Sequence, residues 1–275
     1  MAISSTLAAP APRQAPAGRR SARRAPFRYR PVLLAAFGLL LFLAAWQAVP
    51  SLGLVPPTLL PGPLEIPGAF RREIVGGYWL AAVWASLGHY VTGLVLGSLL
   101  GIALGVATGL WRPLEEATAW LVRLLRPIPG LAWVPFAIVW LGVTPAAATF
   151  IVAVGVFWIN FFAALGAVQS VDRDLIEVAA AFGHRSARGR LTKVILPAAA
   201  PGILAGLRTG LGQAWMAVIA AELFGVPGLG QRMMQASSLL ATDLVVVYMI
   251  TMAALYGAVD SAFLLLRNRV LAWQR

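Results

Sequence analysis

The chain has few of the residue types on which enzymes and metal proteins depend. Cysteine is absent from its 275 residues, which excludes disulfide bonds and thiolate metal sites. There are two histidines, His89 and His184, so one copy of the chain cannot supply a histidine-rich metal site. Neither H-E-x-x-H nor G-x-S-x-G occurs. We therefore expect no catalytic centre, metal or cofactor.

Lysine is almost absent as well. The only lysine is Lys193, and Val194 follows it. A phosphate-binding P-loop needs a lysine followed by serine or threonine after a glycine-rich turn. The chain cannot bind ATP in that way, so any energy must come from another subunit or from an ion gradient.

Charged residues are also scarce, and long stretches of the chain have none. Charged side chains make up 12 % of the chain, against about 25 % in an average protein. Runs of about 20 apolar residues are long enough to cross a bilayer. The sequence predicts an all-α membrane domain over 32–275, with six spans at about 32–50, 83–110, 117–142, 145–168, 201–222 and 243–266.

The basic residues indicate the topology. Sixteen Lys and Arg fall in the segments 1–31, 111–116, 169–197 and 267–275, whereas three, Arg71, Arg72 and Arg232, fall in the intervening connectors. Cytoplasmic loops carry such an excess, so both termini should face the cytoplasm. The net charge of +12 is thus a topology signal and does not indicate nucleic-acid binding. The Pro/Ala/Arg-rich leader, residues 1–31, is predicted to be disordered and cytoplasmic, and the span after it is too long for a cleaved signal peptide.

Glycines recur at every fourth position in two of the spans. The lanes consist of Gly93, Gly97, Gly101, Gly105 and Gly109 in the second span, and of Gly202, Gly206 and Gly210 in the fifth. Small residues four apart let helix backbones approach closely in lipid. We expect both lanes to pack inside the domain, with contact between the two lanes as one arrangement. Self-association of two copies is the alternative.

The connector 169–197 is predicted to contain a short cytoplasmic helix. Asp174 can cap its start, and Glu177, three residues later, completes a capping box. Ala179 and Ala180 favour a helix without bulk, and Gly183 can supply the left-handed residue that ends it. A capped surface helix of no further consequence is one interpretation. A helix this short, however, needs a surface on which to pack.

This connector resembles the EAA motif of ABC-importer permeases. The segment EVAAAFG ends at Gly183, and Leu196 and Pro197 follow at the end of the connector. The motif has Glu-Ala-Ala, three residues, Gly, nine residues, Ile, one residue and Leu-Pro. Here Val178 replaces the first alanine, and Pro197 lies fourteen residues after Gly183 instead of thirteen. Counted back from Leu-Pro, the Ile position falls on Val194.

Other segments resemble the nitrate/sulfonate/taurine-type branch of these permeases. They are LLPGPLEIPGAF (59–70), LRPIPGLAWVPFAIVWLG (125–142), AELFGVPGLG (221–230) and YGAVDSAFLLLRNRVLAW (256–273). The resemblance implies the type I ABC-importer permease fold, with the EAA segment as a coupling helix that binds an ABC ATPase. It also implies two ATPase copies, a second permease copy, a periplasmic substrate-binding protein and a place in the bacterial inner membrane. The ATPase-coupling residues would be Asp174, Glu177, Ala179, Ala180, Gly183, Leu196 and Pro197.

Within the spans, three further features are candidates for a role in transport. Pro127 and Pro129 should kink or break the third span. Arg208 and Asp260 lie in the same third of their spans and can form a charge pair, although a water-filled cavity could solvate each separately. Residues that can line the pathway, unless they are packed or lipid-facing, are Trp158, Asn160, Gln213, Trp215 and Glu222.

We therefore predict the permease subunit of an ATP-driven importer for a small anion such as an aliphatic sulfonate, taurine or nitrate, with no chemistry of its own. Related permeases serve vitamin-precursor-like substrates, which is the first alternative. An ion-coupled secondary transporter is the second, although the halves of the chain show no repeat of the kind such proteins usually have.

Overall fold

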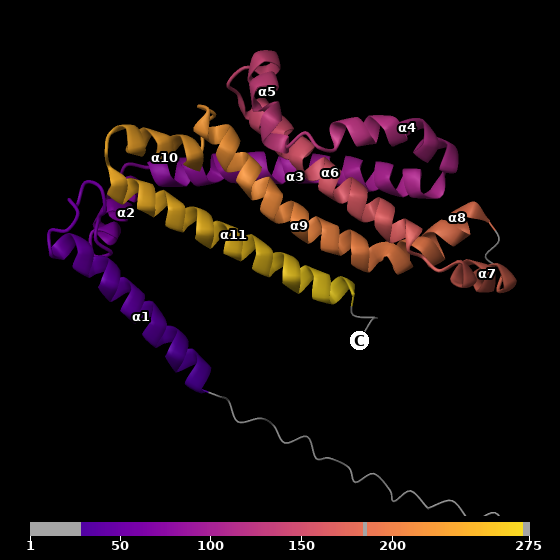
Figure 1. The fold of residues 1–275 in the computed structure, drawn as a ribbon, viewed down its shortest axis with the longest axis horizontal. Helices are drawn as coiled ribbons and strands as arrows, with labels where there is room; N and C mark the ends of the chain where they lie inside the picture. The colour runs from indigo at the N-terminus through magenta and orange to yellow at the C-terminus, as the bar shows by residue number, and fades with distance from the viewer. Residues whose placement is uncertain (1–28, 184–185, 272–275) are drawn as a thin grey trace, which may run out of the picture. The chain divides into compact units, whose positions relative to one another are not determined.

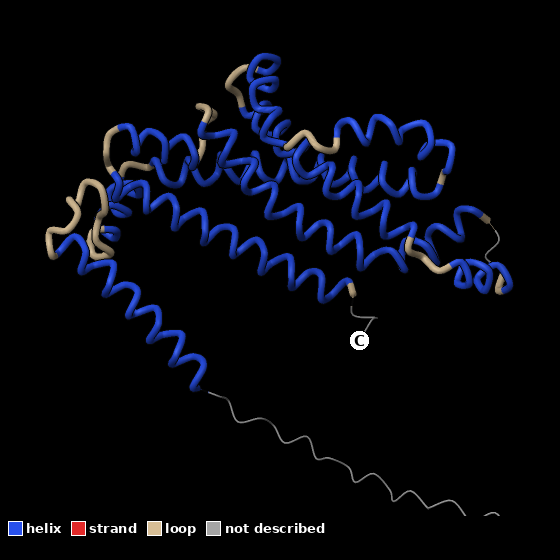
Figure 2. The backbone as a smooth tube through the Cα atoms, viewed as in Figure 1, coloured by secondary structure: helices blue, strands red, loops and turns tan. Residues whose placement is uncertain are grey.

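The computed structural model describes residues 29–183 and 186–271, and every regular element in these ranges is helical (Figures 1 and 2). The predicted disordered leader thus lies almost wholly outside the described residues. The elements are α1 (Tyr29–Ser51), α2 (Ile66–Val75), α3 (Tyr78–Leu110), α4 (Arg112–Leu125), η1 (Gly130–Trp133), α5 (Val134–Leu141), α6 (Pro145–Gln169), α7 (Arg173–Ala181), α8 (Ala187–Arg190), η2 (Leu191–Ile195), α9 (Leu196–Leu223), α10 (Leu229–Ser238) and α11 (Thr242–Val270).

Five of the described helical stretches are long and apolar enough to cross a membrane, and a sixth crossing results if α4 and α5 form one broken span. The predicted span 117–142 is the broken one, since its two halves meet at an angle of 83°. Pro127 and Pro129 lie in this break, as the sequence predicts, because proline donates no backbone hydrogen bond and clashes with the preceding turn. The other predicted spans coincide with α1, α3, α6, α9 and α11.

The described residues up to Ala45 and those from Trp46 onward belong to two separate compact units. In the larger unit α3, α6 and α9 lie side by side, and α6 contacts both of the others (Figure 1). One end of this bundle carries α7 and α8, and the opposite end carries α2 and α10 (Figure 1). We refer to them as the α7 end and the α10 end.

Both glycine lanes pack against α6. A Cβ atom added at Gly101 would lie 2.5 Å from the carbonyl oxygen of Phe157, and one added at Gly202 would lie 2.7 Å from the Cβ of Ala167. The expected contact of the two lanes with each other is therefore wrong, and so is self-association through them. Helix α6 occupies both lanes: the backbone of Ala153 lies against Gly97 of α3, and the small side chains of Ala163 and Ala167 lie against the lane of α9.

The buried side chains form two clusters. The larger lies toward the α10 end and includes Tyr90 of α3, Trp215 of α9 and Tyr248 of α11, and the rings of Tyr90 and Trp215 contact each other edge-on. The smaller lies toward the α7 end and includes Val106, Ile195 and small residues of α6. The bundle is thus closely packed along its length, and α7 lies beside the smaller cluster.

Candidate functional site

Helix α7 begins two residues earlier than the capping-box prediction requires. The side chain of Asp172 accepts a hydrogen bond from the backbone N–H of Asp174 at 3.0 Å, and its own backbone is extended, as a capping residue requires. Asp172 is therefore the N-cap, and the prediction that Asp174 caps the helix with Glu177 in a capping box is wrong. Asp174 lies in the first turn, where its charge interacts favourably with the helix dipole.

Helix α7 ends at the predicted place. Gly183 has φ of +90°, the left-handed conformation that favours glycine, and its N–H donates to the carbonyl oxygen of Ala180 at 3.2 Å. Nothing lies within 4 Å of the position that a Cβ would occupy at Gly183. The glycine is thus required by backbone conformation and not by lack of space.

Helix α7 has two apolar faces. On one face Ile176 packs against the smaller buried cluster of the bundle. On the other face Leu175, Val178 and Phe182 are spaced as neighbours on a helix surface, and their exposed fractions are 51 %, 54 % and 81 %. Glu177 is also exposed, whereas Ala179 and Ala180 are half-buried. The helix therefore rests on the bundle with one face and leaves the other uncovered within the described residues.

The turn from α7 into α9 accommodates the extra residue of the motif. Residues Leu191–Ile195 form a π-helical turn, in which the N–H of Leu196 bonds to the carbonyl oxygen of Leu191. A π-helical turn contains one more residue than an α-helical turn, and such turns are frequent at functional sites. As a result Ile195, not Val194, is the buried aliphatic residue. Leu196 packs beside the same cluster as Ile176, and Pro197 begins the long helix α9.

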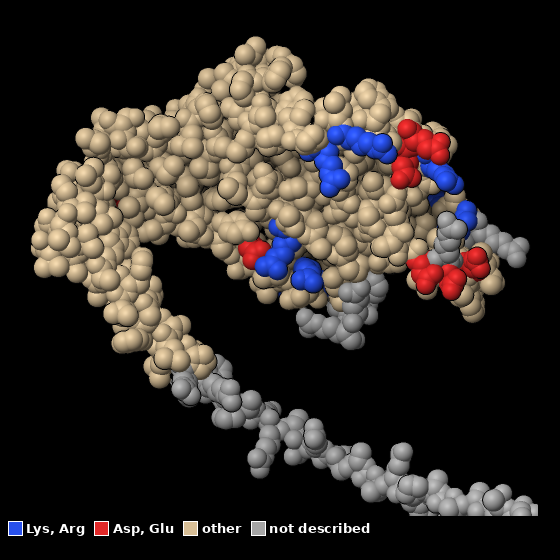
Figure 3. Space-filling view, in the orientation of Figure 1, with Lys and Arg blue, Asp and Glu red and all other residues tan. Residues whose placement is uncertain are grey.

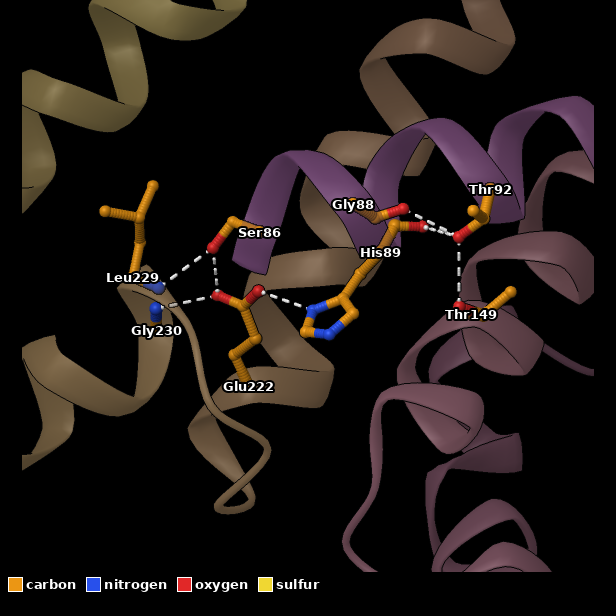
Figure 4. Close-up of polar contacts among 8 residues, drawn as sticks. All are labelled: Ser86, Gly88, His89, Thr92, Thr149, Glu222, Leu229 and Gly230. Atoms are coloured by element: carbon orange, nitrogen blue, oxygen red, sulfur yellow. Dashed lines mark hydrogen bonds and ion pairs between the residues drawn. The ribbon is translucent and has the colours of Figure 1, made fainter. Parts of the chain in front are cut away.

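A buried carboxylate forms the second candidate site, at the α10 end (Figure 4). Glu222, in the last turn of α9, is fully buried. Its Oε2 accepts from the Ser86 hydroxyl at 2.8 Å and from the Gly230 N–H at 2.9 Å, and its Oε1 lies 3.1 Å from Nδ1 of His89. Ser86 and His89 lie one turn apart on the same face of α3 (Figure 4).

A second polar cluster ties α2 to α10 and α11. Nη2 of Arg232 donates to both carboxylate oxygens of Glu73, at 3.0 and 3.2 Å, and the Tyr248 hydroxyl donates to the same carboxylate. Burial lowers the pKa of the Arg232 guanidinium, but its hydrogen bonds to Tyr248 and Glu73 outweigh that effect and leave the pKa above its usual value. Arg72 of α2 also pairs with Asp243 at the start of α11.

The structure brings Arg208 and Asp260 together. Nε and Nη2 of Arg208 donate to the two carboxylate oxygens of Asp260, each at 3.1 Å, so that a two-point ion pair links α9 to α11.

On the face of the molecule seen in Figure 3, charged side chains gather toward the α7 end and below the bundle, and few are visible at the α10 end.

The structure separates the five pathway candidates into two groups. Asn160, Trp215 and Glu222 are buried among helices of the same chain, so they do not line a pathway in this conformation. Asn160 donates to the Ser98 hydroxyl at 2.9 Å, and the ring of Trp215 stacks edge-on against that of Tyr90. Trp158 and Gln213 are half-buried, which leaves them as the two candidates with accessible surface.

Sequence reasoning did not find the partners of Glu222 or the cluster around Glu73. The spacing of Ser86 and His89 was the available signal, because polar residues three apart on an apolar span lie on one face. Glu73 and Tyr248 are 175 positions apart, and no local pattern connects them.

Comparison with known proteins gives one family. Residues 93–272 match the family described as binding-protein-dependent transport system inner membrane component. The putative aliphatic sulfonates transport permease protein SsuC of Bacillus subtilis is 33 % identical over 86 % of this chain and 87 % of its own. The taurine transport system permease protein TauC of Escherichia coli is 32 % identical over 91 % and 94 %. A chain of the MetNI methionine ABC transporter, solved in inward-facing conformations, superposes with a TM-score of 0.55 at 22 % identity, over 70 % of this chain and 98 % of its own.

Proposed function

Since this chain belongs to the family of binding-protein-dependent transport system inner membrane components and is a permease subunit of an ABC importer, we propose that it takes up a small organic or inorganic oxyanion. The permease is not an enzyme, and it works with a separate ATPase subunit and a substrate-binding protein. Transport is therefore driven by ATP hydrolysis in a partner subunit, and the alternative of an ion-coupled secondary transporter is set aside.

A sulfonate is the substrate class that the relatives favour. The SsuC and TauC relatives are named for aliphatic sulfonates and for taurine, and both cover most of this chain. Nitrate is a small oxyanion of the same charge, and a vitamin-precursor-like molecule is the alternative of a different class. Glu222 is fully buried and does not face a pathway in this conformation, so it does not contact a substrate there.

We place the α7 end in the cytoplasm and the α10 end outside an inner membrane, with both termini cytoplasmic. The distribution of charge supports this orientation. The segments 111–116, 169–197 and 267–275 together hold nine Lys and Arg (one, five and three), whereas the outer connectors hold three, Arg71, Arg72 and Arg232. Two of these three arginines are engaged by acidic partners, Arg72 by Asp243 and Arg232 by Glu73.

We propose that α7 couples the permease to its ATPase, because one apolar face of this helix is uncovered. Leu175, Val178 and Phe182 would bind in a groove of the ATPase subunit, and Ile176 would pass the movement to the bundle. The π-helical turn and Leu196-Pro197 connect α7 to α9, so that a displacement of α7 moves a membrane-spanning helix as a rigid body. We propose two permease copies, as a homodimer, with two ATPase copies.

Phe182→Asp tests the coupling proposal. Leu239→Asp is the matched control, because Leu239 is as exposed as Phe182, 80 % against 81 %, but lies at the end of α10. Each variant is purified together with its ATPase subunit and substrate-binding protein. We expect about a tenfold loss of bound ATPase for Phe182→Asp, or about 1.4 kcal/mol, because a carboxylate enters an apolar interface. Unchanged ATPase binding by Phe182→Asp would exclude α7 as the coupling helix.

The substrate class is tested with the intact complex in liposomes. ATP hydrolysis is measured with the binding protein and, in separate samples, with taurine, an alkanesulfonate, nitrate and a pyrimidine vitamin precursor. Stimulation by the sulfonates supports the proposal. Stimulation by the pyrimidine compound alone would overturn the substrate class while leaving the coupling proposal intact.

A further inference from the structure

Helix α10 has no capping side chain of its own. Its N-cap residue is Gly228, and the first N–H groups of any helix need partners from outside the helix. Here the N–H of Leu229 donates to Oγ of Ser86 at 2.9 Å, and the N–H of Gly230 donates to Oε2 of Glu222 (Figure 4). The start of α10 is thus capped by side chains of α3 and α9, and the negative carboxylate lies at the positive end of the α10 dipole.

The turn that leads into α10 is fitted closely onto this carboxylate. A Cβ at Gly228 would collide with the carboxyl group of Glu222, and a Cβ at Gly230 would lie 2.7 Å from the carbonyl oxygen of Ile219. Beneath the turn, Val226 and Leu229 are buried almost completely. Glu222 therefore determines where residues 224–230 lie, and the two glycines let the turn reach it.

Residues 224–230 can separate from Glu222 and α3 without breaking the rest of the packing. Gly225 has φ of +104°, a conformation open to glycine, and it follows the last residue of α9 closely. Two backbone N–H groups hold the turn, that of Leu229 on the Ser86 hydroxyl and that of Gly230 on the Glu222 carboxylate, and water can satisfy all of these groups after separation. The contacts of α3 with α6 differ, because there the backbones themselves are in contact.

We propose that Glu222, with Ser86 and His89, is the positioning residue of an outer gate formed by residues 224–230. The turn is docked on α3 while the pathway is closed to the outside, and it undocks when the pathway opens outward. This inference rests on the proposed function, which places the α10 end outside. Ionisable groups kept at membrane depth are costly and are usually functional, which is the physical reason to assign Glu222 a role in the cycle. Hinged loops at the mouth of a site commonly control access in this way.

The absence of cysteine makes a direct test simple, since any introduced thiol is the only one in the permease. Val226→Cys places a thiol beneath the turn. Leu239→Cys is a matched exposed control at the end of α10, and Ala164→Cys is a buried control within α6. The complex of permease and ATPase is placed in nanodiscs and treated with a charged maleimide, first without nucleotide and then with Mg-ATP and orthovanadate.

We expect the thiol at position 226 to be protected without nucleotide and to react about tenfold faster after vanadate trapping, because local opening exposes it. Glu222→Gln replaces one acceptor oxygen with a donor, so it should raise the rate without nucleotide by about the same factor. The control thiol at position 239 should react at one rate throughout, and that at position 164 should stay protected.

Two outcomes would overturn the gate. One is a thiol at 226 that stays protected under vanadate while the complex hydrolyses ATP. The other is an unchanged rate in Glu222→Gln without nucleotide. If the thiol at 164 also reacts in Glu222→Gln, that variant is unfolded, and Ser86→Ala, which removes one hydroxyl, is measured in its place with the same two outcomes. The measurement without nucleotide needs no ATPase, so a failure of the proposed function and a failure of the gate are distinguishable.

Discussion

Small residues are concentrated in two regions of the chain, the contacts of α6 with α3 and α9, and the segment from α7 into α9. In the first region Gly101 faces the backbone of α6, and an added Cβ would lie 2.5 Å from a carbonyl oxygen. In the second region Gly183 has open space around it and a left-handed backbone. One glycine is required by packing and the other by conformation, so the two regions should respond to different substitutions.

The two regions should differ in rigidity. The lane of α3 contacts the backbone of α6, and the lane of α9 contacts mostly alanine Cβ atoms of α6, so few side chains could rearrange and α3, α6 and α9 should move together. Helix α7 contacts the bundle on one face only and is joined to α9 through a π-helical turn. A signal from a partner would therefore enter at a weakly packed helix and be passed to a rigid bundle.

The largest expected effect is that of Gly101→Val. The neighbours of the new side chain are backbone atoms of α6, which cannot move aside individually. Overpacking should cost about 3 kcal/mol, measured as a loss of monodisperse protein and a lower Tm in detergent. Gly88→Val, on the same helix but with nothing within 4 Å, is the control. Equal behaviour of the two variants would mean that α3 and α6 are not in close contact.

Gly183→Val should leave the fold intact but reduce coupling. A β-branched residue disfavours φ of +90°, and a left-handed residue costs about 2 kcal/mol, which corresponds to about a thirtyfold decrease in stimulated ATP hydrolysis. Insertion and the packing of the bundle should not change, because nothing lies near this position and the strain can be relieved by a local rearrangement at the end of α7.

Gly183→Asn separates conformation from space at the same position. Asparagine is larger than alanine but adopts the left-handed conformation with little strain. We expect it to retain most of the stimulated hydrolysis. A loss as large as that of the valine variant would indicate that the surface of a partner, not the backbone, requires glycine at 183.

Local patterns predicted most of the fold. Apolar length gave the spans, the Pro127–Pro129 pair gave the break, and Gly183 gave the end of α7. Each of these depends on physics within a few neighbouring residues. Asp174 was predicted as the N-cap, whereas Asp172 is the N-cap in the structure. Both residue types are good caps, and the backbone conformation at each position, which the sequence does not show, decides between them.

Contacts between distant residues were predicted less well. The periodicity of a glycine lane indicates close packing but does not identify the neighbour, which proved to be α6 for both lanes. Glu222 was noted as a polar residue in a span, but its partners Ser86, His89 and Gly230 come from three other parts of the chain. The pairing of Arg208 with Asp260 could be predicted from the sequence, because each is an isolated charge of opposite sign in the same third of its span.

The ion pair of Arg208 and Asp260 is a third kind of contact, between α9 and α11. Asp260→Asn or Arg208→Gln should each lower the Tm of the protein in nanodiscs, because each change removes the two-point ion pair that links α9 to α11. Arg208→Asp combined with Asp260→Arg should recover most of this loss, measured as Tm. If the double variant melts below both single variants, the pair does not contribute to the joining of the two helices.

The smallest expected effect concerns the start of α7. Asp172→Ala removes the cap, at a cost of about 1 kcal/mol. Hydrogen exchange followed by mass spectrometry should show about fivefold faster exchange of the α7 amides, since 1 kcal/mol is a factor of about five. The exchange of α6 amides should not change, because its backbone is held by two glycine lanes.

Asp172→Asn and Asp174→Ala distinguish the cap from the general effect of negative charge. Asparagine keeps the side-chain oxygen that accepts from the Asp174 N–H, so Asp172→Asn should exchange as slowly as the natural protein. Asp174→Ala removes only a charge near the helix dipole, and salt screens that interaction. At 1 M salt its exchange should therefore approach that of the natural protein, whereas Asp172→Ala should remain fast. The opposite order would return the cap to Asp174 and move the start of α7 two residues toward Gly183.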